Sequence, residues 1–186
     1  RISEENKLGP VLVQTLKKIS KTFDNIKVII PTVNNLRNDI SILFEGMDFP
    51  IFIITDYEQK INALKSSDVA IAASGSVSLE LAMLDVPHII TYKVNPISAV
   101  LFKFLSLTKY VNIINYLYDE EIIPELLQSK CNQEDLYRAS IALLKNKDMQ
   151  CKQTSIFRKL NERLLNNNFN PSDIAADTIL SENQQR

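Results

Sequence analysis

The sequence is poor in the residues that most metal and nucleophile chemistry requires. Its 186 residues include one histidine, His88, and two cysteines, Cys131 and Cys151, whose spacing matches no metal-binding pair. A structural zinc site needs several Cys or His ligands, so we expect none, and no metal or other cofactor is predicted. No Ser-His-Asp set and no Walker A loop occurs either. The two cysteines suit a reducing cytoplasmic setting.

The sequence also has almost no excess of one sign of charge over the other. The net charge of −1 at pH 7 provides no long-range field that would recruit DNA, RNA or anionic lipid, so we expect no nucleic-acid partner. Neither a secretory signal pattern nor an apolar run of bilayer-spanning length is found. With 45% apolar and 23% charged residues, the composition is typical of a globular protein with one sizeable core.

Apolar runs of strand length alternate with helical patterns in the first half of the sequence. We expect strands at 26–30, 51–55, 69–73 and 88–92, and helices at 10–21, 36–44, 58–66 and 76–84. This alternation predicts an α/β fold with a Rossmann-like parallel sheet flanked by helices. Further helices are expected at 97–107, 119–130, 133–145, 151–166 and 172–181. We therefore predict one domain at 1–145 and C-terminal helices at 146–186 that pack on it or on a partner.

The most informative segment is a strand that turns through Ser74, Gly75 and Ser76 into a helix. Such a turn directs unpaired backbone N–H groups and the positive end of a helix dipole at one point, which suits a phosphate. Gly75 permits close approach of the backbone, and either serine can cap the helix or donate to phosphate oxygens. Glu80, one turn further, can accept hydrogen bonds from ribose. The alternative is an ordinary helix start with Glu80 on a solvated face.

Other polar residues follow the predicted strands and would gather along the same edge of the sheet. Lys93, after the strand that ends at Tyr92, is either a phosphate ligand or an ordinary surface lysine. A short strand-like run at 110–115 would bring Asn115 to the same edge if it extends the sheet. His88 lies within an apolar strand, and we assign it a structural role.

The segment 97–107 is strongly apolar, and Lys103 is its only charged residue. It is too short to span a bilayer. Two interpretations remain open: a helix buried against the sheet or a partner, or a surface for acyl chains or shallow membrane contact.

An ordered series of short motifs resembles lipid-A-disaccharide synthase, a GT-B glycosyltransferase of Gram-negative bacteria. The series comprises Ser67-Asp68, Ala73-Ser74-Gly75-Ser76, Leu79-Glu80, Tyr92-Lys93, Pro96, Tyr110-Val111, Asn115 and Glu125-Leu126-Leu127-Gln128. The resemblance covers residues 1 to about 145. Arg1 is similar to the arginine that closes the family's Gly-Ser-Arg loop, so we expect that loop and an N-terminal domain outside this sequence.

The resemblance implies one half of a GT-B fold that binds the sugar donor. The family transfers 2,3-diacylglucosamine from UDP-2,3-diacylglucosamine to 2,3-diacylglucosamine 1-phosphate and releases UDP, usually without a metal. Matched positions imply that Ser74, Gly75 and Ser76 hold the diphosphate and that Glu80 binds ribose. Arg1 and Asn115 would be catalytic residues near the diphosphate and sugar, and Tyr92 and Lys93 would complete the donor site. The general base that an inverting transfer needs is expected in the other domain.

Two positions depart from the family pattern. Ser76-Val77 replaces the usual Thr-Ala and keeps the hydroxyl, and Ile114 replaces the proline before the matched asparagine. The resemblance implies a cytoplasmic enzyme, with peripheral contact at the inner face of the inner membrane and a homodimer as open possibilities. Alternative functions are another GT-B enzyme such as a UDP-GlcNAc 2-epimerase, or a non-catalytic nucleotide-binding or assembly module.

Overall fold

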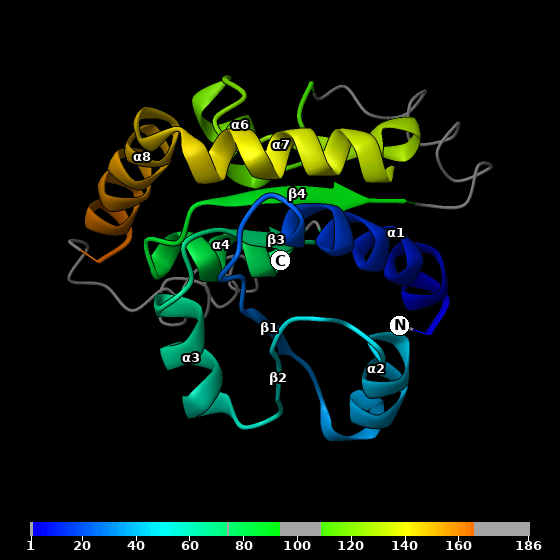
Figure 1. Ribbon diagram of the computed structural model, residues 1–186. Helices are drawn as coiled ribbons and strands as arrows, with labels where there is room; N and C mark the ends of the chain where they lie inside the picture. Colours follow the sequence, from blue (N-terminus) through cyan, green and yellow to red (C-terminus); the bar gives the residue numbers. More distant parts are fainter. Residues whose placement is uncertain (1, 74, 94–108, 166–186) are drawn as a thin grey trace, which may run out of the picture.

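The computed structural model describes residues 2–73, 75–93 and 109–165, whose strands form two parallel sheets (Figure 1). One sheet has the order β1-β2 and the other has the order β3-β4-β5. The strands are β1 (Val28–Pro31), β2 (Ile51–Ile54), β3 (Ala70–Ala72), β4 (His88–Tyr92) and β5 (Glu125–Leu127). The helices are α1 (Ile2–Ser20), α2 (Arg37–Leu43), α3 (Tyr57–Lys65), α4 (Ser76–Met83), α6 (Ile113–Tyr118), α7 (Gln133–Lys145) and α8 (Lys147–Leu165), with 3-10 turns η1 (Asn34–Leu36) and η2 (Gln128–Lys130).

Helices cover both faces of the β3-β4-β5 sheet. Successive strand residues point to opposite faces, so Ile89 and Ile90 of β4, both fully buried, enter different cores. Ile89 packs in a cluster with side chains of α1 and α7, such as Leu136. Ile90 lies in a second cluster with side chains of α4, α6 and α8, such as Leu81 and Phe157. The sheet is therefore the middle of three layers, which confirms the predicted fold class.

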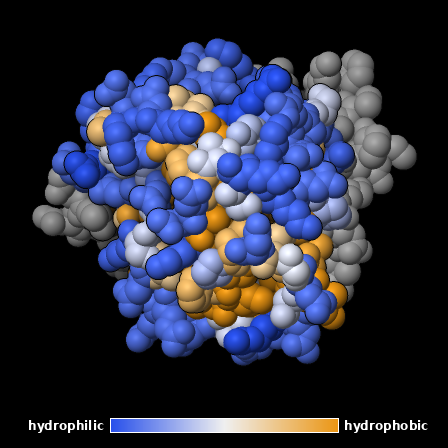
Figure 2. Space-filling model, viewed as in Figure 1, coloured by the Kyte–Doolittle hydropathy of each residue, from blue (hydrophilic) through white to orange (hydrophobic). Residues whose placement is uncertain are grey.

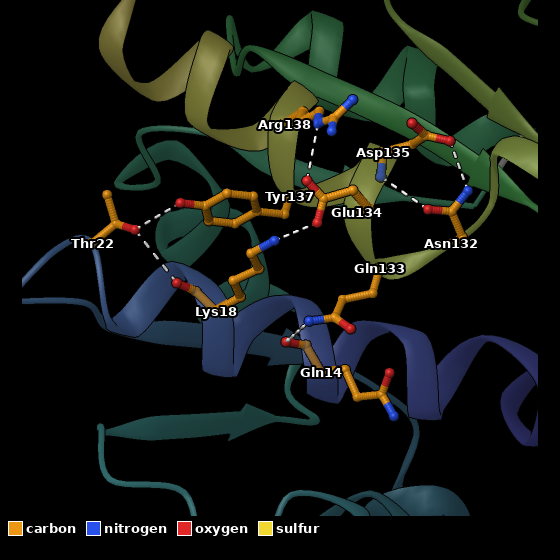
Figure 3. Close-up of polar contacts among 9 residues, drawn as sticks. All are labelled: Gln14, Lys18, Thr22, Asn132, Gln133, Glu134, Asp135, Tyr137 and Arg138. Carbon is orange, nitrogen blue, oxygen red and sulfur yellow. Dashed lines mark hydrogen bonds and ion pairs between the residues drawn. The ribbon is translucent and has the colours of Figure 1, made fainter.

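Polar contacts fasten α1 to α7 along the outer side of the first cluster (Figure 3). Lys18 of α1 forms an ion pair with Glu134 of α7 and lies over the ring of Tyr137, with 4.4 Å from Nζ to the ring centroid. The hydrogen bond from Lys18 lowers the pKa of Glu134. The hydroxyls of Thr22 and Tyr137 lie 2.9 Å apart. These contacts set the position of α1 against the sheet.

Four strands and most helices agree with the sequence-based expectations, whereas three expectations are wrong. The run at 110–115 is not a strand, because the side chain of Asn112 accepts hydrogen bonds from Ile114 and Asn115 and starts helix α6. The segment 119–130 is not a helix: it contains β5 and η2, and Gln128 has a left-handed φ of 53°. Helix α1 begins at Ile2, so Pro10 lies inside it.

Some expectations fall on residues that the structure leaves undescribed. The expected helices at 97–107 and 172–181 lie outside the described residues, as do Arg1 and Ser74. Within the described ranges, no helix combines the length and the apolar character needed to cross a membrane.

Candidate nucleotide-binding site

The turn between β3 and α4 requires a glycine. Gly75 has a φ of 122° and a ψ of −152°, a conformation that residues with a Cβ rarely adopt. It also occupies the N-cap position of α4, and no side chain of the described residues caps this helix. Ser76, expected as a possible cap, is instead the first residue of the helix and is exposed. The first turn of α4 therefore presents backbone N–H groups and the positive end of the helix dipole to the surface.

Glu80, one turn into α4, forms an ion pair with Lys60 of α3. Lys60 Nζ lies 2.6 Å from Oε1 and 2.8 Å from Oε2 of Glu80, so the ammonium is shared between both carboxylate oxygens. The two side chains are 28% and 26% exposed. Glu80 is therefore a mostly covered, paired carboxylate rather than one on a freely solvated face.

A buried chain of hydrogen bonds lies directly beneath this helix. Ser78 of α4 and His88 of β4 are both fully buried, with 2.8 Å between Ser78 Oγ and His88 Nε2. His88 Nδ1 lies 2.9 Å from the carbonyl oxygen of Val86, which can only accept, so Nδ1 carries the proton and Nε2 accepts from Ser78. The amide of Asn112 donates in turn to Ser78 Oγ at 2.6 Å.

Burial determines the charge of His88. Loss of hydration lowers its pKa to about 4, against the opposing effect of the hydrogen bond to Val86, so the ring is neutral at pH 7. Its ring also stacks on Phe157 of α8 at a centroid distance of 5.3 Å. This geometry agrees with the structural role expected for His88.

Asn115 lies inside α6 and is fully buried. The run at 110–115 does not extend the sheet, so the condition under which Asn115 was expected at the carboxyl edge is not met. Its Oδ1 accepts from the backbone N–H groups of Ile122 and Ile123 at 2.9 Å each. Its Nδ2 donates to the carbonyl oxygen of Ile123 at 2.7 Å and to Glu125 at 2.8 Å. Both ends of the amide are thus used internally, and they fix the loop that leads into β5.

The structure brings several predicted site residues to one edge of the sheet. β3 and β4 are parallel neighbours, so the Gly75 turn after β3 and Lys93 after β4 lie at the same, carboxyl, edge. Tyr92 ends β4 and is half-buried, and Lys93 is exposed. Gly75, Ser76, Tyr92 and Lys93 therefore share this edge, with Glu80 one helical turn behind it. Arg1 and Ser74 lie outside the described residues.

Lys60 was not anticipated from the sequence, although the helical pattern contained a signal. It lies four residues before Leu64, which is buried, so both side chains project from one side of α3. Across the described ranges, no group of three or more His, Cys, Asp or Glu side chains is placed to hold a metal ion. The local charge at the site comes from the helix dipole, the Lys60–Glu80 pair and Lys93.

Parallel strands, helices on both faces and a glycine turn into α4 define a Rossmann-like α/β domain, a class that binds ligands at the carboxyl edge of its sheet. The model of the lipid-A-disaccharide synthetase family matches residues 1–179, and the chain belongs to that family. It is 35% identical over 182 residues to the lipid-A-disaccharide synthase of Paramagnetospirillum magneticum. It is 30% identical over 175 residues to that of Rickettsia prowazekii.

The chain spans about half the length of these curated relatives. The match covers 97% of this chain and 46% of the Paramagnetospirillum protein, and 93% and 46% for the Rickettsia protein. Among solved structures, MurG of Acinetobacter baumannii superimposes with a TM-score of 0.56 at 16% identity. That match covers 83% of this chain and 42% of MurG, and it supports the predicted assignment to one half of a GT-B fold.

Proposed function

We propose that this chain is the donor-binding half of a lipid-A-disaccharide synthase. The complete enzyme would transfer 2,3-diacylglucosamine from UDP-2,3-diacylglucosamine to 2,3-diacylglucosamine 1-phosphate and release UDP. Family membership supports the reaction, and the uncapped turn at Gly75 supports the place of binding. Family membership also favours a transferase over the epimerase and the non-catalytic module. A neutral, buried His88 would be a poor acid or base for an epimerase.

The proposed contacts follow from the geometry of the turn. The diphosphate would lie against the backbone N–H groups of Ser76 and its neighbours at the start of α4, where Gly75 leaves room for close approach. Ser74 belongs to the same proposal by its position in the sequence. Lys93 would add a positive charge at the same edge. When the bond to the sugar breaks, the helix dipole and Lys93 would stabilise the negative charge that develops on UDP.

Glu80 would bind the ribose rather than the phosphates, because a carboxylate beside a diphosphate is electrostatically unfavourable. Lys60 holds both of its oxygens, and each oxygen retains capacity to accept a hydroxyl hydrogen. We propose that Lys60 positions this carboxylate and reduces its repulsion of the nucleotide. Tyr92 would form part of the wall of the donor site. Asn115 would affect the site indirectly, by holding the loop between α6 and β5 in place, because both ends of its amide are hydrogen-bonded to that loop.

The acceptor site and the general base would lie in a separate N-terminal domain, and Arg1 would lie near the diphosphate at the junction. This chain alone is therefore expected to bind UDP without transferring sugar. Because both substrates carry acyl chains, we also propose that the enzyme works at the inner face of the bacterial inner membrane. The apolar segment 97–107 supports that placement by composition.

Calorimetric titration of the chain with UDP, UMP and ADP tests this assignment. We expect binding in the micromolar to millimolar range with preference for UDP. Glu80→Gln should weaken it by about 1–3 kcal/mol, the scale of a hydrogen bond to a charged group. Glu162→Gln is the matched control, because Glu162 is exposed on α8. Equal affinity in the two variants would contradict the role of Glu80, and equal binding of ADP and UDP would contradict a uridine-specific site.

A further inference from the structure

The start of α4 carries an exposed apolar side chain beside the proposed phosphate-binding turn. Val77 follows Gly75 and Ser76 in the first turn of the helix and is 42% exposed. The next residue, Ser78, is fully buried and lies within hydrogen-bond distance of His88. The surface next to the turn is therefore apolar where Val77 lies, although a diphosphate by itself requires only polar groups.

A hydrogen bond brings the start of α6 to the same place. The amide of Asn112 donates to Ser78 Oγ at 2.6 Å, and both side chains are buried. The residues on either side of Asn112 are Val111 and Ile113, which are 45% and 46% exposed. Because Val77 precedes Ser78 and the other two flank Asn112, three exposed β-branched residues lie around one short contact between α4 and α6.

Helix α6 is apolar on its outer face as well as on its inner face. Ile114 and Tyr118 pack in the core cluster beneath the helix, whereas Ile113, Tyr116 and Leu117 are 46%, 57% and 58% exposed. These three residues are spaced three and four apart, which places them on one side of a helix. A surface helix normally presents polar residues to water, so an exposed apolar face indicates an apolar partner.

The backbone at the start of α6 is held firmly in place. Glu125 of β5 accepts hydrogen bonds from the N–H of Val111 at 2.9 Å and from the N–H of Asn112 at 3.0 Å. The bond between the side chains of Asn112 and Ser78 adds a connection to α4. These contacts fix the backbone that carries Val111 and Ile113, so the apolar surface exists before any ligand binds and needs little ordering.

We infer that this α4-α6 apolar surface, formed by Val77, Val111, Ile113, Tyr116 and Leu117, binds an acyl chain of the sugar donor. The assignment rests on the proposed function, in which the donor is a UDP-linked, diacylated glucosamine. Its acyl groups are attached to the two ring carbons that follow the anomeric carbon, so both chains leave the sugar within a few bonds of the diphosphate. A diphosphate at the start of α4 therefore brings an acyl chain close to Val77, where contact removes apolar surface of both partners from water.

Charge and size disfavour two other occupants of the α4-α6 apolar surface. Three acidic residues at 119–121 directly follow α6, and their charge disfavours contact with an anionic lipid bilayer at this place. A stable protein interface uses about 20–30 residues on each side, many more than the five side chains of this surface. A single acyl chain matches both its size and its lack of charge.

Calorimetric titration with two donors tests the inference. UDP-2,3-diacylglucosamine is compared with UDP-GlcNAc, which carries one acetyl group in place of the long chains, at concentrations below micelle formation. We expect the diacylated donor to bind at least about 10-fold more tightly, a gain for which burial of about two methylene groups suffices. In the double variant Val111→Ser/Ile113→Ser this ratio should fall below about threefold. The affinity for UDP, measured for every variant, is the reference for an intact nucleotide site.

Exposed apolar residues elsewhere provide the matched control. Figure 2 shows another apolar surface, over β1 and β2, which form the sheet that does not include β3. Phe52 of β2 and Ile42 of the neighbouring α2 are 49% and 70% exposed. Ile42→Ser removes an apolar side chain of the same kind and should leave the ratio unchanged. NMR of labelled methyl groups should show shifts at Val111 and Ile113 with the diacylated donor and not with UDP-GlcNAc.

Three results would overturn the inference while UDP still binds. The two donors could bind equally well. The ratio could persist in Val111→Ser/Ile113→Ser, with methyl shifts on another surface. It could also fall to the same extent in Ile42→Ser, which would show that acyl chains adsorb to apolar residues in general. Each of these results contradicts the acyl-chain site alone, whereas a chain that does not bind UDP contradicts the proposed function as well.

Discussion

Lys60 of α3 and Glu80 of α4 form an ion pair in which the lysine Nζ lies 2.6 and 2.8 Å from the two carboxylate oxygens. The pair links the helix before β3 to the helix after it, so it spans the strand whose end forms the glycine turn. Both side chains are about a quarter exposed. The pair therefore fixes a carboxylate one turn behind the positive end of α4.

Replacement of Lys60 should have a modest effect on stability. We expect Lys60→Met to lower the free energy of unfolding by about 0.5–1 kcal/mol, since partly solvated pairs contribute little more. Urea denaturation measures this change. Lys65→Met on the exposed side of α3 is the matched control and should have almost no effect. If both variants behave alike, the pair does not stabilise the packing of α3 on α4.

His88 should remain neutral in the folded protein until the pH is well below 6. Its pKa is lowered by burial to about 4, whereas an unfolded histidine titrates near 6.5, so the unfolded state binds the proton first as the pH falls. Its contribution to stability is therefore complete above about pH 6.5 and is lost between about pH 6.5 and 4. The loss reaches about 3 kcal/mol.

Because His88 is the single histidine of the sequence, NMR can follow its ring without assignment ambiguity. We expect one imidazole that does not titrate above about pH 5 and that carries its proton on Nδ1. The dependence of unfolding free energy on pH should be weaker in His88→Gln. A titration midpoint near 6.5 would show that the hydrogen bonds to Ser78 and Val86 do not persist in solution.

Removal of the Asn115 side chain should be strongly destabilising. Asn115→Ala would leave the N–H groups of Ile122 and Ile123 without their buried acceptor. We expect a loss of about 3 kcal/mol or more, since each unsatisfied buried group costs about 1–3 kcal/mol. Thermal or urea unfolding measures it, and Asn62→Ala on the surface of α3 is the control. A loss below about 1 kcal/mol, the net value of a single hydrogen bond, would contradict the structural role.

The sequence predicted the part of the fold that depends on local pattern. The apolar runs of β1 to β4 and the helices between them are recognisable because strand and helix periodicities differ. β5 was missed because three residues, Glu125–Leu127, carry too little periodicity, and only pairing with β4 makes them a strand. The β-branched residues next to Asn112 favoured a strand, but the side chain of Asn112 caps α6 and a helix forms there instead.

Of the candidate site, only the turn between β3 and α4, whose residues are adjacent in sequence, could be predicted. Gly75 indicated the turn in the sequence, because a glycine between a strand and a helix is typical of an unusual backbone conformation. The partners of the site are distant in sequence: Lys60 lies twenty residues from Glu80, and Gln153 lies 65 residues from His88. Such pairs follow from the packing of whole helices, which no local pattern encodes. The split of the sheet is likewise visible only in three dimensions.

The most direct test of the nucleotide-binding assignment is an NMR titration of the isotope-labelled chain with UDP. We predict that the largest amide shifts occur at Gly75, Ser76 and Val77, with smaller shifts at Glu80 and Lys93, and that they saturate at micromolar to millimolar UDP. Shifts confined to other surfaces, or none at millimolar UDP, would contradict a donor site at the start of α4.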